Sequence, residues 1–231
     1  MVDVLAELRA ALDVHRLKVR GVVDPAPGEL LPARELAHAG TLVLVGNVGS
    51  SMWAQFAASP EYRDSIPDPL DRWSRRIGLE LARRFDALAL FPFGGPPHHP
   101  FQRWAVRAGT IASSPLGLLI DHEFGLWHAY RFALVLPRHL PLTQTPLAVD
   151  SPCATCTGEP CLHTCPVGAF SVGEYHVDRC VGHLSGALGE ACMGHGCMAR
   201  LACPMGQASR YRADHARFHM ESFVKARPAL R

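Results

Sequence analysis

The chain has 231 residues, of which 48% are apolar and 19% are charged, so it can bury the core of one globular domain, or of one domain with a large appendix. This composition excludes overall disorder. The formal charge is only +2, so no broad cationic field indicates a dedicated binder of nucleic acid or of anionic membranes. No apolar run approaches the roughly 20 residues of a membrane-spanning helix, and the first residues are acidic where a signal peptide is positive and then apolar. We therefore predict a cytoplasmic protein without membrane or nucleic-acid partners.

The first part of the chain predicts a helix and then a buried strand. Residues 1–16 carry apolar side chains at three and four spacing, which favours an amphipathic helix packed on a core. The short run Leu42–Val45 favours a strand, and the tight loop 46–51 follows it directly. The serines of this loop could present backbone N–H groups to a ligand's phosphate or amide carbonyl. Turn and cap chemistry is favoured, because the loop is neither GxGxxG nor a Walker loop.

A second helix is predicted to begin at Asp68-Pro69, where the aspartate caps and the proline takes the first helical position. Its apolar stripe consists of Leu70, Trp73, Ile77, Leu81 and Phe85. Residues 87–91 then favour a strand that opens into a loop, 92–100, rich in proline and glycine. This loop carries His98 and His99 and is either a spacer or a site for a metal or ligand.

Two further strands are predicted at residues 116–120 and 128–136, joined by a short turn as an antiparallel pair. Helices and strands do not alternate regularly, which favours an α+β sandwich over a doubly wound parallel sheet. Residues 138–146 have the proline density of a connector. We therefore place a domain boundary near Ala148.

All eight cysteines lie between Cys153 and Cys203, and this segment is expected to carry the function. The first four follow the pattern Cys-x2-Cys-x4-Cys-x3-Cys-Pro, and the closing Cys-Pro is typical of ferredoxin-type 4Fe-4S ligation. The middle gap is two residues longer than in the usual bacterial run. A second group ends on Cys203-Pro204. Zinc remains an alternative because paired cysteines also build zinc sites, and disulfides are another, although they fit poorly with a chain lacking an export signal.

The ferredoxin rule divides the eight cysteines into two sets. In two-cluster ferredoxins the cysteine before proline ligates the other cluster, so each run exchanges its last cysteine. This rule predicts a first cysteine set of Cys153, Cys156, Cys161 and Cys203. It predicts a second cysteine set of Cys165, Cys180, Cys192 and Cys197. The second set is irregularly spaced, and Arg200 stands where a ferredoxin-like Cys-x2-Cys has a thiolate.

Few cations accompany these cysteines. Arg179 and Arg200 are the only basic residues between Cys153 and Cys203 apart from histidines, so backbone N–H groups must stabilise much of the sulfur charge. Such groups are expected near Gly168, Gly194 and Gly196. Three histidines among the cysteines are interpreted as hydrogen-bond donors or surface residues rather than ligands: His163, His183 and His195.

The cysteine segment, with Val177-Asp178-Arg179-Cys180 and Gly196-Cys197, resembles the dicluster region of epoxyqueuosine reductases and reductive dehalogenases. Those families reduce substrates at a cobalamin fed by two 4Fe-4S clusters. The earlier part of the chain is similar to the CblC family of cobalamin-processing proteins, on Asp68-Pro69-Leu70-Asp71 and the stretch 124–137. The resemblance implies a nitroreductase-like antiparallel sandwich over residues 1–148, a bacterial-type two-cluster ferredoxin domain over 149–208 and a C-terminal helix over 209–231.

The chain departs from these families in three respects. The acidic motif that supplies the proton donor in epoxyqueuosine reductases is not recognisable, and the long C-terminal extension of many of them is missing. The Asp-x-His-x2-Gly motif that donates a histidine to cobalt is also absent, so the resemblance implies no histidine beneath cobalt. Arg131 falls where CblC proteins place an arginine near their thiol cosubstrate, although a salt bridge at the core is an equal alternative. The candidate cobalamin contacts are Trp127, Tyr130, Arg131, His98 and His99.

The resemblance thus implies an iron-sulfur cobalamin reductase, or an enzyme that removes the upper ligand of cobalamin, served by a low-potential electron donor. Two alternatives stay open: a reductase of another small molecule using cobalamin or flavin, and a non-catalytic electron-transfer or cobalamin-trafficking protein. The oligomeric state is left open, a dimer included.

Overall fold

The fold was analysed in a computed structural model, which describes residues 3–25, 40–109, 111–140, 150–171 and 173–227. The chain divides into two compact units. The first unit contains residues 1–110 and 128–149, and the second contains residues 111–127 and 150–231. In the described residues no helix combines the length and the apolar character needed to cross a membrane.

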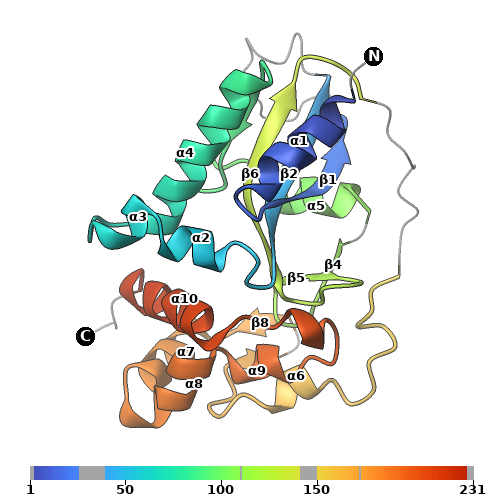
Figure 1. The fold of residues 1–231 in the computed structure, drawn as a ribbon. Helices are drawn as coiled ribbons and strands as arrows, with labels where there is room; N and C mark the ends of the chain where they lie inside the picture. Colours follow the sequence, from blue (N-terminus) through green and yellow to red (C-terminus); the bar gives the residue numbers. More distant parts are fainter. Residues whose placement is uncertain (1–2, 26–39, 110, 141–149, 172, 228–231) are drawn as a thin grey trace. The chain divides into compact units, whose positions relative to one another are not determined.

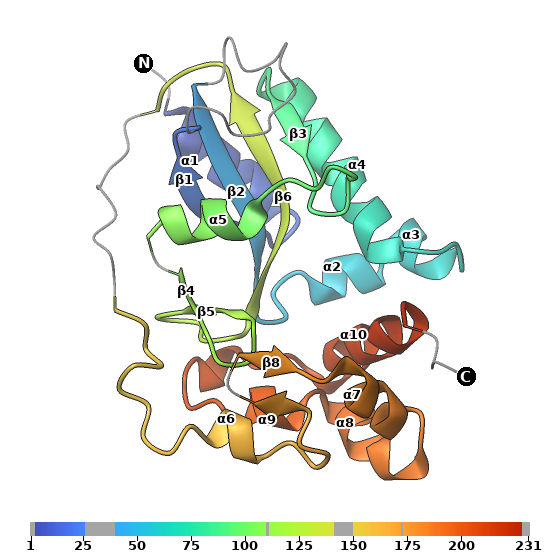
Figure 2. The same cartoon turned by 180° about the vertical axis from the view of Figure 1, so that it is seen from behind.

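The first unit is built on a four-stranded antiparallel sheet of order β1-β2-β6-β3. The strands are β1 (Lys18–Val23), β2 (Thr41–Val48), β3 (Leu88–Leu90) and β6 (His128–Leu136). The helices are α1 (Val4–Asp13), α2 (Trp53–Ala57), α3 (Pro60–Arg63), α4 (Pro69–Arg84) and α5 (Phe101–Arg107). Figures 1 and 2 show α1 and α4 on one face of the sheet and α5 on the other. Both faces are therefore covered, and β2 is buried from Thr41 to Asn47.

Helix α4 packs closely on the sheet because Gly78 leaves room for two aromatic rings. A Cβ at position 78 would lie 2.9 Å from a ring carbon of Phe91 and 3.2 Å from the ring of Phe132. The apolar stripe predicted for this helix is buried throughout or nearly so, and Trp73 and Ile77 belong to the core. The predicted helix and its buried face are confirmed.

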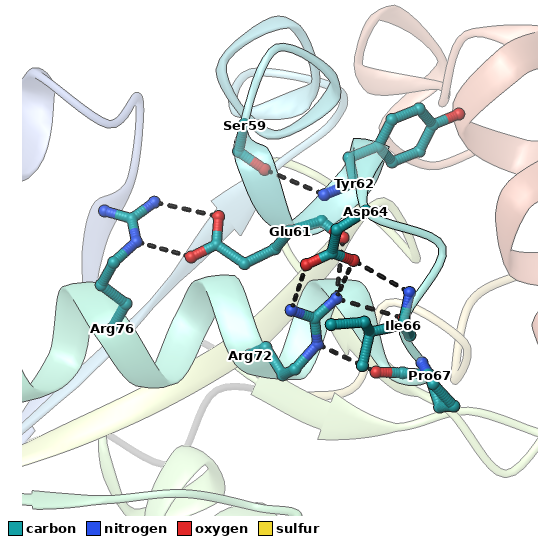
Figure 3. A network of polar contacts seen from close by, with 8 residues as sticks. All are labelled: Ser59, Glu61, Tyr62, Asp64, Ile66, Pro67, Arg72 and Arg76. Carbon is teal, nitrogen blue, oxygen red and sulfur yellow. Dashed lines mark hydrogen bonds and ion pairs between the residues drawn. The ribbon is translucent and has the colours of Figure 1, made fainter.

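The start of α4 differs from the prediction. Asp68 occupies the N-cap position, but its backbone is left-handed (φ 55°) and its side chain makes no capping hydrogen bond. The segment before the helix is held by Arg72, which donates to both carboxylate oxygens of Asp64 at 2.8 and 2.6 Å and to the Pro67 carbonyl at 3.0 Å (Figure 3). Arg76 also forms a two-point ion pair with Glu61 of α3, at 2.6 and 3.2 Å (Figure 3). The predicted aspartate cap is therefore not formed, and arginine side chains on the helix hold the preceding segment instead.

The loop after β2 shows turn chemistry. The Ser51 hydroxyl donates to the Arg16 carbonyl at 2.9 Å, and the Trp53 N–H donates to the Ser50 carbonyl at 3.1 Å. The five-residue helix α2 follows, and its N-cap is Met52, without a side-chain hydrogen bond. These contacts agree with the favoured interpretation of residues 46–51.

The second unit carries the cysteines on short elements. It contains two hairpins, β4 (Ile111–Ser113) with β5 (Leu119–Asp121) and β7 (Phe170–Ser171) with β8 (Glu174–Tyr175). Its α-helices are α6 (Pro160–His163), α7 (Val177–Leu184), α8 (Glu190–His195), α9 (Met198–Leu201) and α10 (Ala213–Lys225). Two 3-10 turns are η2 (Ala187–Gly189) and η3 (Gln207–Ser209).

Three predictions about residues 111–231 need correction. The strand predicted at 116–120 exists but begins only at Leu119, as β5: residues 114–118 form the turn of the β4–β5 hairpin, and Gly117 there has a positive φ of 71°. The predicted pairing of that strand with residues 128–136 is also wrong, because β6 pairs with β2 and β3. Finally, residues 111–127 group with the cysteine segment and not with the residues that precede them. Helix α10, predicted as a separate C-terminal helix, groups with the cysteine segment as well.

Candidate functional site

The cysteines gather around two separate cavities of the second unit. The first cavity, which is partly open to solvent, is lined by Cys153, Cys156, Cys161 and Cys203. The second cavity is lined by Cys165, Cys180, Cys192 and Cys197. These are the two cysteine sets that the ferredoxin rule predicts, with each Cys-Pro cysteine placed with the other run.

Electrostatic coupling gives the same division. Burial raises the pKa of the Cys203 thiol, and charge on Cys153 and Cys156 raises it further. Burial likewise raises the pKa of Cys180, as does charge on Cys165 and Cys192. The thiols of Cys161 and Cys197 respond in the same way to members of their own sets. Because charge interactions weaken with distance, this pattern means that the members of each set lie near one another.

Short helices and prolines position these side chains. Cys161 lies in α6, which begins at Pro160, while Cys180 lies in α7 and Cys192 in α8. Gly196 has a positive φ of 95°, and the turn that it allows brings Cys197 to the N-cap of α9. Proline after Cys203 prevents the chain from continuing as a helix. The irregular spacing of the second set thus reflects successive short helices that each deliver one thiol.

The walls of both cavities are mainly apolar. The hairpin β4–β5 covers the first cavity with Leu116 and Ile120, and Leu126 lies beside them. The second cavity is walled by Phe170 and Leu184, and by Met220 of α10. Residues 111–127 and α10 therefore belong to the site, although the sequence analysis gave neither segment a role there. Leu116 and Ile120 are ordinary apolar residues of a short hairpin before the connector, so the sequence contains no signal that they wall this cavity.

Backbone and side-chain groups donate to several sulfurs. The Ala169 N–H donates to the Cys165 sulfur at 3.3 Å, immediately after Gly168, where such a donor was expected. The Met198 N–H is hydrogen bonded to Cys192, and the Met205 N–H to Cys203. Of the histidines considered above, His163 and His195 are exposed, while His183 lines the second cavity. The Nε2 atom of His183 is buried without a hydrogen-bond partner in the described part of the chain.

Arg200 does not take the place of a ligand at the second cavity. Its guanidinium lies 4.5 Å from the ring centroids of both Trp127 and Tyr211, and it donates to the Leu126 carbonyl. Only its backbone N–H reaches a thiol, that of Cys197. Cys192, on a different helix, supplies the fourth thiol of the cavity instead. The side chain of Arg200 thus fastens residues 126–127 within the second unit.

The donor chemistry of both cavities fits a polynuclear metal centre. All eight cysteines are free thiols, so the disulfide alternative is not what the structure shows. Four thiolates crowded in an apolar cavity repel one another, and bound cationic metal compensates such repulsion. Four thiols lie in the wall of each cavity, and four thiolates are the ligand set of such a centre.

The candidate cobalamin contacts are spread over both units. Trp127 belongs to the second unit, is 3% exposed and packs edge-on against Tyr211 at 5.5 Å. The other four belong to the first unit. His98 is exposed, and His99 stacks on the buried Trp104 at 6.0 Å.

Tyr130 and Arg131 lie near the start of β6 and are half-buried. Since β3 runs antiparallel to β6 and pairs Leu90 with Ala133, the loop 92–100 leaves β3 at the end of the sheet where Arg131 lies. Asp71 of α4 is also near Arg131: burial raises the pKa of its carboxyl, and the charge of Arg131 partly offsets this. A basic and an acidic side chain therefore meet at this end of the sheet.

Comparison with solved structures finds proteins of both families that the sequence resembles. A selenomethionine-labelled epoxyqueuosine reductase is 16% identical over 92% of this chain and 69% of that chain, with a TM-score of 0.48. The B12-trafficking protein CblC of C. elegans is 12% identical over 97% of this chain and 95% of that chain, with a TM-score of 0.49. An epoxyqueuosine reductase with an epoxyqueuosine-modified tRNA stem loop is 17% identical over 92% of this chain and 60% of that chain, with a TM-score of 0.45. These matches concern the fold, and the site rests on the geometry described above.

No protein-family model matches the chain, and no curated protein sequence matches it.

Proposed function

We propose that the chain is an iron-sulfur oxidoreductase whose two cysteine sets each hold a 4Fe-4S cluster and which delivers electrons to the cobalt of a cobalamin. It acts as a cobalamin reductase or removes the upper ligand of cobalamin. The observation that carries the proposal is the division of eight cysteines into two cavities with four thiols each. Four thiolates are the ligand set of a 4Fe-4S cluster.

The protein's own residues have three tasks at these cavities. The cysteine thiolates hold the iron, and the apolar walls, with Leu116 and Phe170 among them, limit the access of water. Backbone N–H groups such as that of Ala169 stabilise negative charge on sulfur. A 4Fe-4S cluster, when bound, supplies one-electron transfer at low potential.

For the corrinoid we propose Tyr130, Arg131 and His98, at the end of the sheet formed by β3 and β6. The register of β3 and β6 supports this placement, because it puts the start of the loop 92–100 beside Arg131. Trp127 and His99 have packing roles in the structure, against Tyr211 and Trp104 respectively. A corrinoid without a strong lower ligand is easier to reduce, and the chain lacks the motif that would supply a histidine beneath cobalt. A flavin is the alternative cofactor for the same region.

The test uses the full chain, purified without oxygen and reconstituted with iron and sulfide. Iron and sulfide analysis should give two 4Fe-4S clusters, and addition of hydroxocobalamin with a low-potential donor should give the Co(II) spectrum faster than in a protein-free control. Cys156→Ser, which removes a ligand of the first set, should abolish the acceleration. Arg131→Gln should weaken cobalamin binding while leaving the iron content unchanged.

Other outcomes separate the alternatives. Protein that is colourless and loaded with zinc would overturn the proposal. Cobalamin binding without acceleration would favour a trafficking protein. Turnover of a halogenated or epoxide substrate in place of cobalamin would favour a reductase of another small molecule. The same assay with a modified tRNA stem loop tests the prediction that nucleic acid is not a partner.

A further inference from the structure

The two cavities differ in the hydrogen-bond donors and charges around their sulfurs, although the burial classes of their cysteines are alike. Each cysteine set contains one buried cysteine, Cys203 or Cys192, and three half-buried ones. The hydrogen bonds and charges around the two sets are unequal.

In the second cavity every cysteine has a hydrogen-bond donor from another residue. Ala169 donates to Cys165, and the N–H groups of Ala199 and Arg200 donate to Cys197. Cys192 is hydrogen bonded by the Met198 N–H, and Cys180 by the Tyr175 hydroxyl.

The Tyr175 ring is held in place for this contact. Tyr175 pairs with Phe170 across the β7–β8 hairpin, and the two rings stack at 4.5 Å and 10°. The ring centroid of Phe223, in α10, lies 6.3 Å from that of Tyr175. His183 also lines this cavity, and its buried Nε2 atom has no hydrogen-bond partner among the described residues. The second cavity is thus rich in donors.

The first cavity has fewer donors and a negative charge. Cys203 is hydrogen bonded by the Met205 N–H, and Cys153 by the Ser151 hydroxyl. That hydroxyl has one proton and also donates to the Ser113 carbonyl at 3.4 Å, so its contribution is divided. Glu159 lines this cavity together with Cys153. No carboxylate lines the second cavity in the described part of the chain.

Reduction adds one negative charge to a thiolate-ligated cluster. Hydrogen bonds to its sulfurs stabilise this charge and raise the reduction potential, while a nearby carboxylate lowers it. We propose that the cluster of the second cysteine set has the higher reduction potential, set by Tyr175, His183 and the surrounding backbone N–H groups, and that the cluster of the first set has the lower one, depressed by Glu159. This inference rests on the proposed function, since it requires both clusters.

The electron balance is simple. An external low-potential one-electron donor loses one electron and one cluster gains it, and no bond to a proton or leaving group changes. The first electron delivered then resides at the second cavity, and a second electron is needed to reduce the first cavity as well. The two clusters therefore differ in role. The cluster of the second cavity stores an electron, and the reduced cluster of the first cavity is the stronger reductant that passes its electron on.

The experiment is a potentiometric titration of the reconstituted full chain, followed by electron paramagnetic resonance. Two midpoint potentials are expected. Tyr175→Phe and His183→Leu should each shift the higher midpoint to more negative values and leave the lower one in place. Glu159→Gln should shift the lower midpoint to more positive values and leave the higher one in place. His163→Leu, which changes an exposed histidine, is the control and should shift neither.

The result that overturns the inference is a single shared midpoint, or a Tyr175→Phe shift in the lower midpoint. Iron analysis of each variant shows whether a cluster was lost instead. If His183→Leu loses iron, the conservative Tyr175→Phe variant decides the test. Protein without iron overturns both the inference and the proposed function. Two clusters with reversed potentials overturn the inference alone.

Discussion

Cys203 lies against the same cavity as Cys153, whereas Cys197, much closer to Cys203 in the chain, lines the other cavity. The chain therefore passes from one cavity to the other within α9. The same exchange occurs between Cys161 and Cys165, so the two cavities share two crossing segments. Since no cysteine lines both cavities, a change at a single cysteine should affect one centre and leave the other intact.

Loss of one ligand from each set tests this independence. Cys156→Ser and Cys192→Ser each remove one of four thiols, from the first and the second cavity respectively. Each variant should retain about half of the wild-type iron and sulfide, because one four-cysteine site remains complete. Met193→Leu, beside Cys192 on α8, is the control and should keep full iron content. Loss of all iron in either single variant would contradict two separate centres.

Arg200 should contribute to stability rather than to metal binding. Its guanidinium contacts the rings of Trp127 and Tyr211 and donates to the Leu126 carbonyl. Arg200→Lys keeps the charge but loses planar stacking, so we expect the free energy of unfolding to fall by about 1–2 kcal/mol. Urea denaturation measures the change. The control is Arg179→Lys, since Arg179 is exposed and makes only a 3.3 Å hydrogen bond to Gly168, and it should change stability little.

The tight contact of α4 with the sheet predicts opposite effects at two helical glycines. Gly78→Ala gains about 1 kcal/mol of helix propensity but costs about 1–3 kcal/mol of overpacking against Phe91 and Phe132, so we expect net destabilisation. Gly182→Ala in α7 meets no atom of the described residues within 4 Å, so it should stabilise by up to about 1 kcal/mol. Urea denaturation of both variants is the measurement. A stabilising Gly78→Ala would show that the rings move aside easily.

The ion pair between Glu61 and Arg76 should make stability depend on pH. The hydrogen bond from Arg76 lowers the pKa of Glu61 below its ordinary value of 4.5, despite the opposing effect of burial. A carboxyl with a depressed folded pKa stabilises above its unfolded pKa, and this stabilisation is lost as the pH falls through the folded value. Arg76→Gln should therefore lower the free energy of unfolding by about 1 kcal/mol at neutral pH, since Arg76 is half exposed.

That deficit should begin to shrink as the pH falls below the ordinary Glu61 pKa of 4.5, and it should vanish below the lowered folded pKa, where Glu61 is protonated in both states. Thermal unfolding at a series of pH values checks it. Lys18→Gln removes the exposed ion pair with Asp13 and serves for comparison, with a much smaller change at every pH. A deficit for Arg76→Gln that stays constant with pH would assign the effect to packing of the arginine stem.

Local sequence patterns determined much of this protein. The stripe of α4 and the strand His128–Leu136 follow from apolar spacing, which acts within one element. The division of the cysteines follows from the two Cys-Pro endings, because a chain that turns at proline carries its last thiol away from its own run. The corrinoid residues, by contrast, stay a prediction.

The tertiary structure alone decided the rest. Nothing in the sequence of residues 111–127 shows that the β4–β5 hairpin walls the first cavity, since its pairing depends on groups distant in the chain. Nor does spacing show that Cys192 supplies the fourth thiol while the side chain of Arg200 turns to Trp127, or that Asp68 makes no capping hydrogen bond at the start of α4. Such choices depend on which side chains can be buried together, and the energy of burial is settled only when distant segments pack.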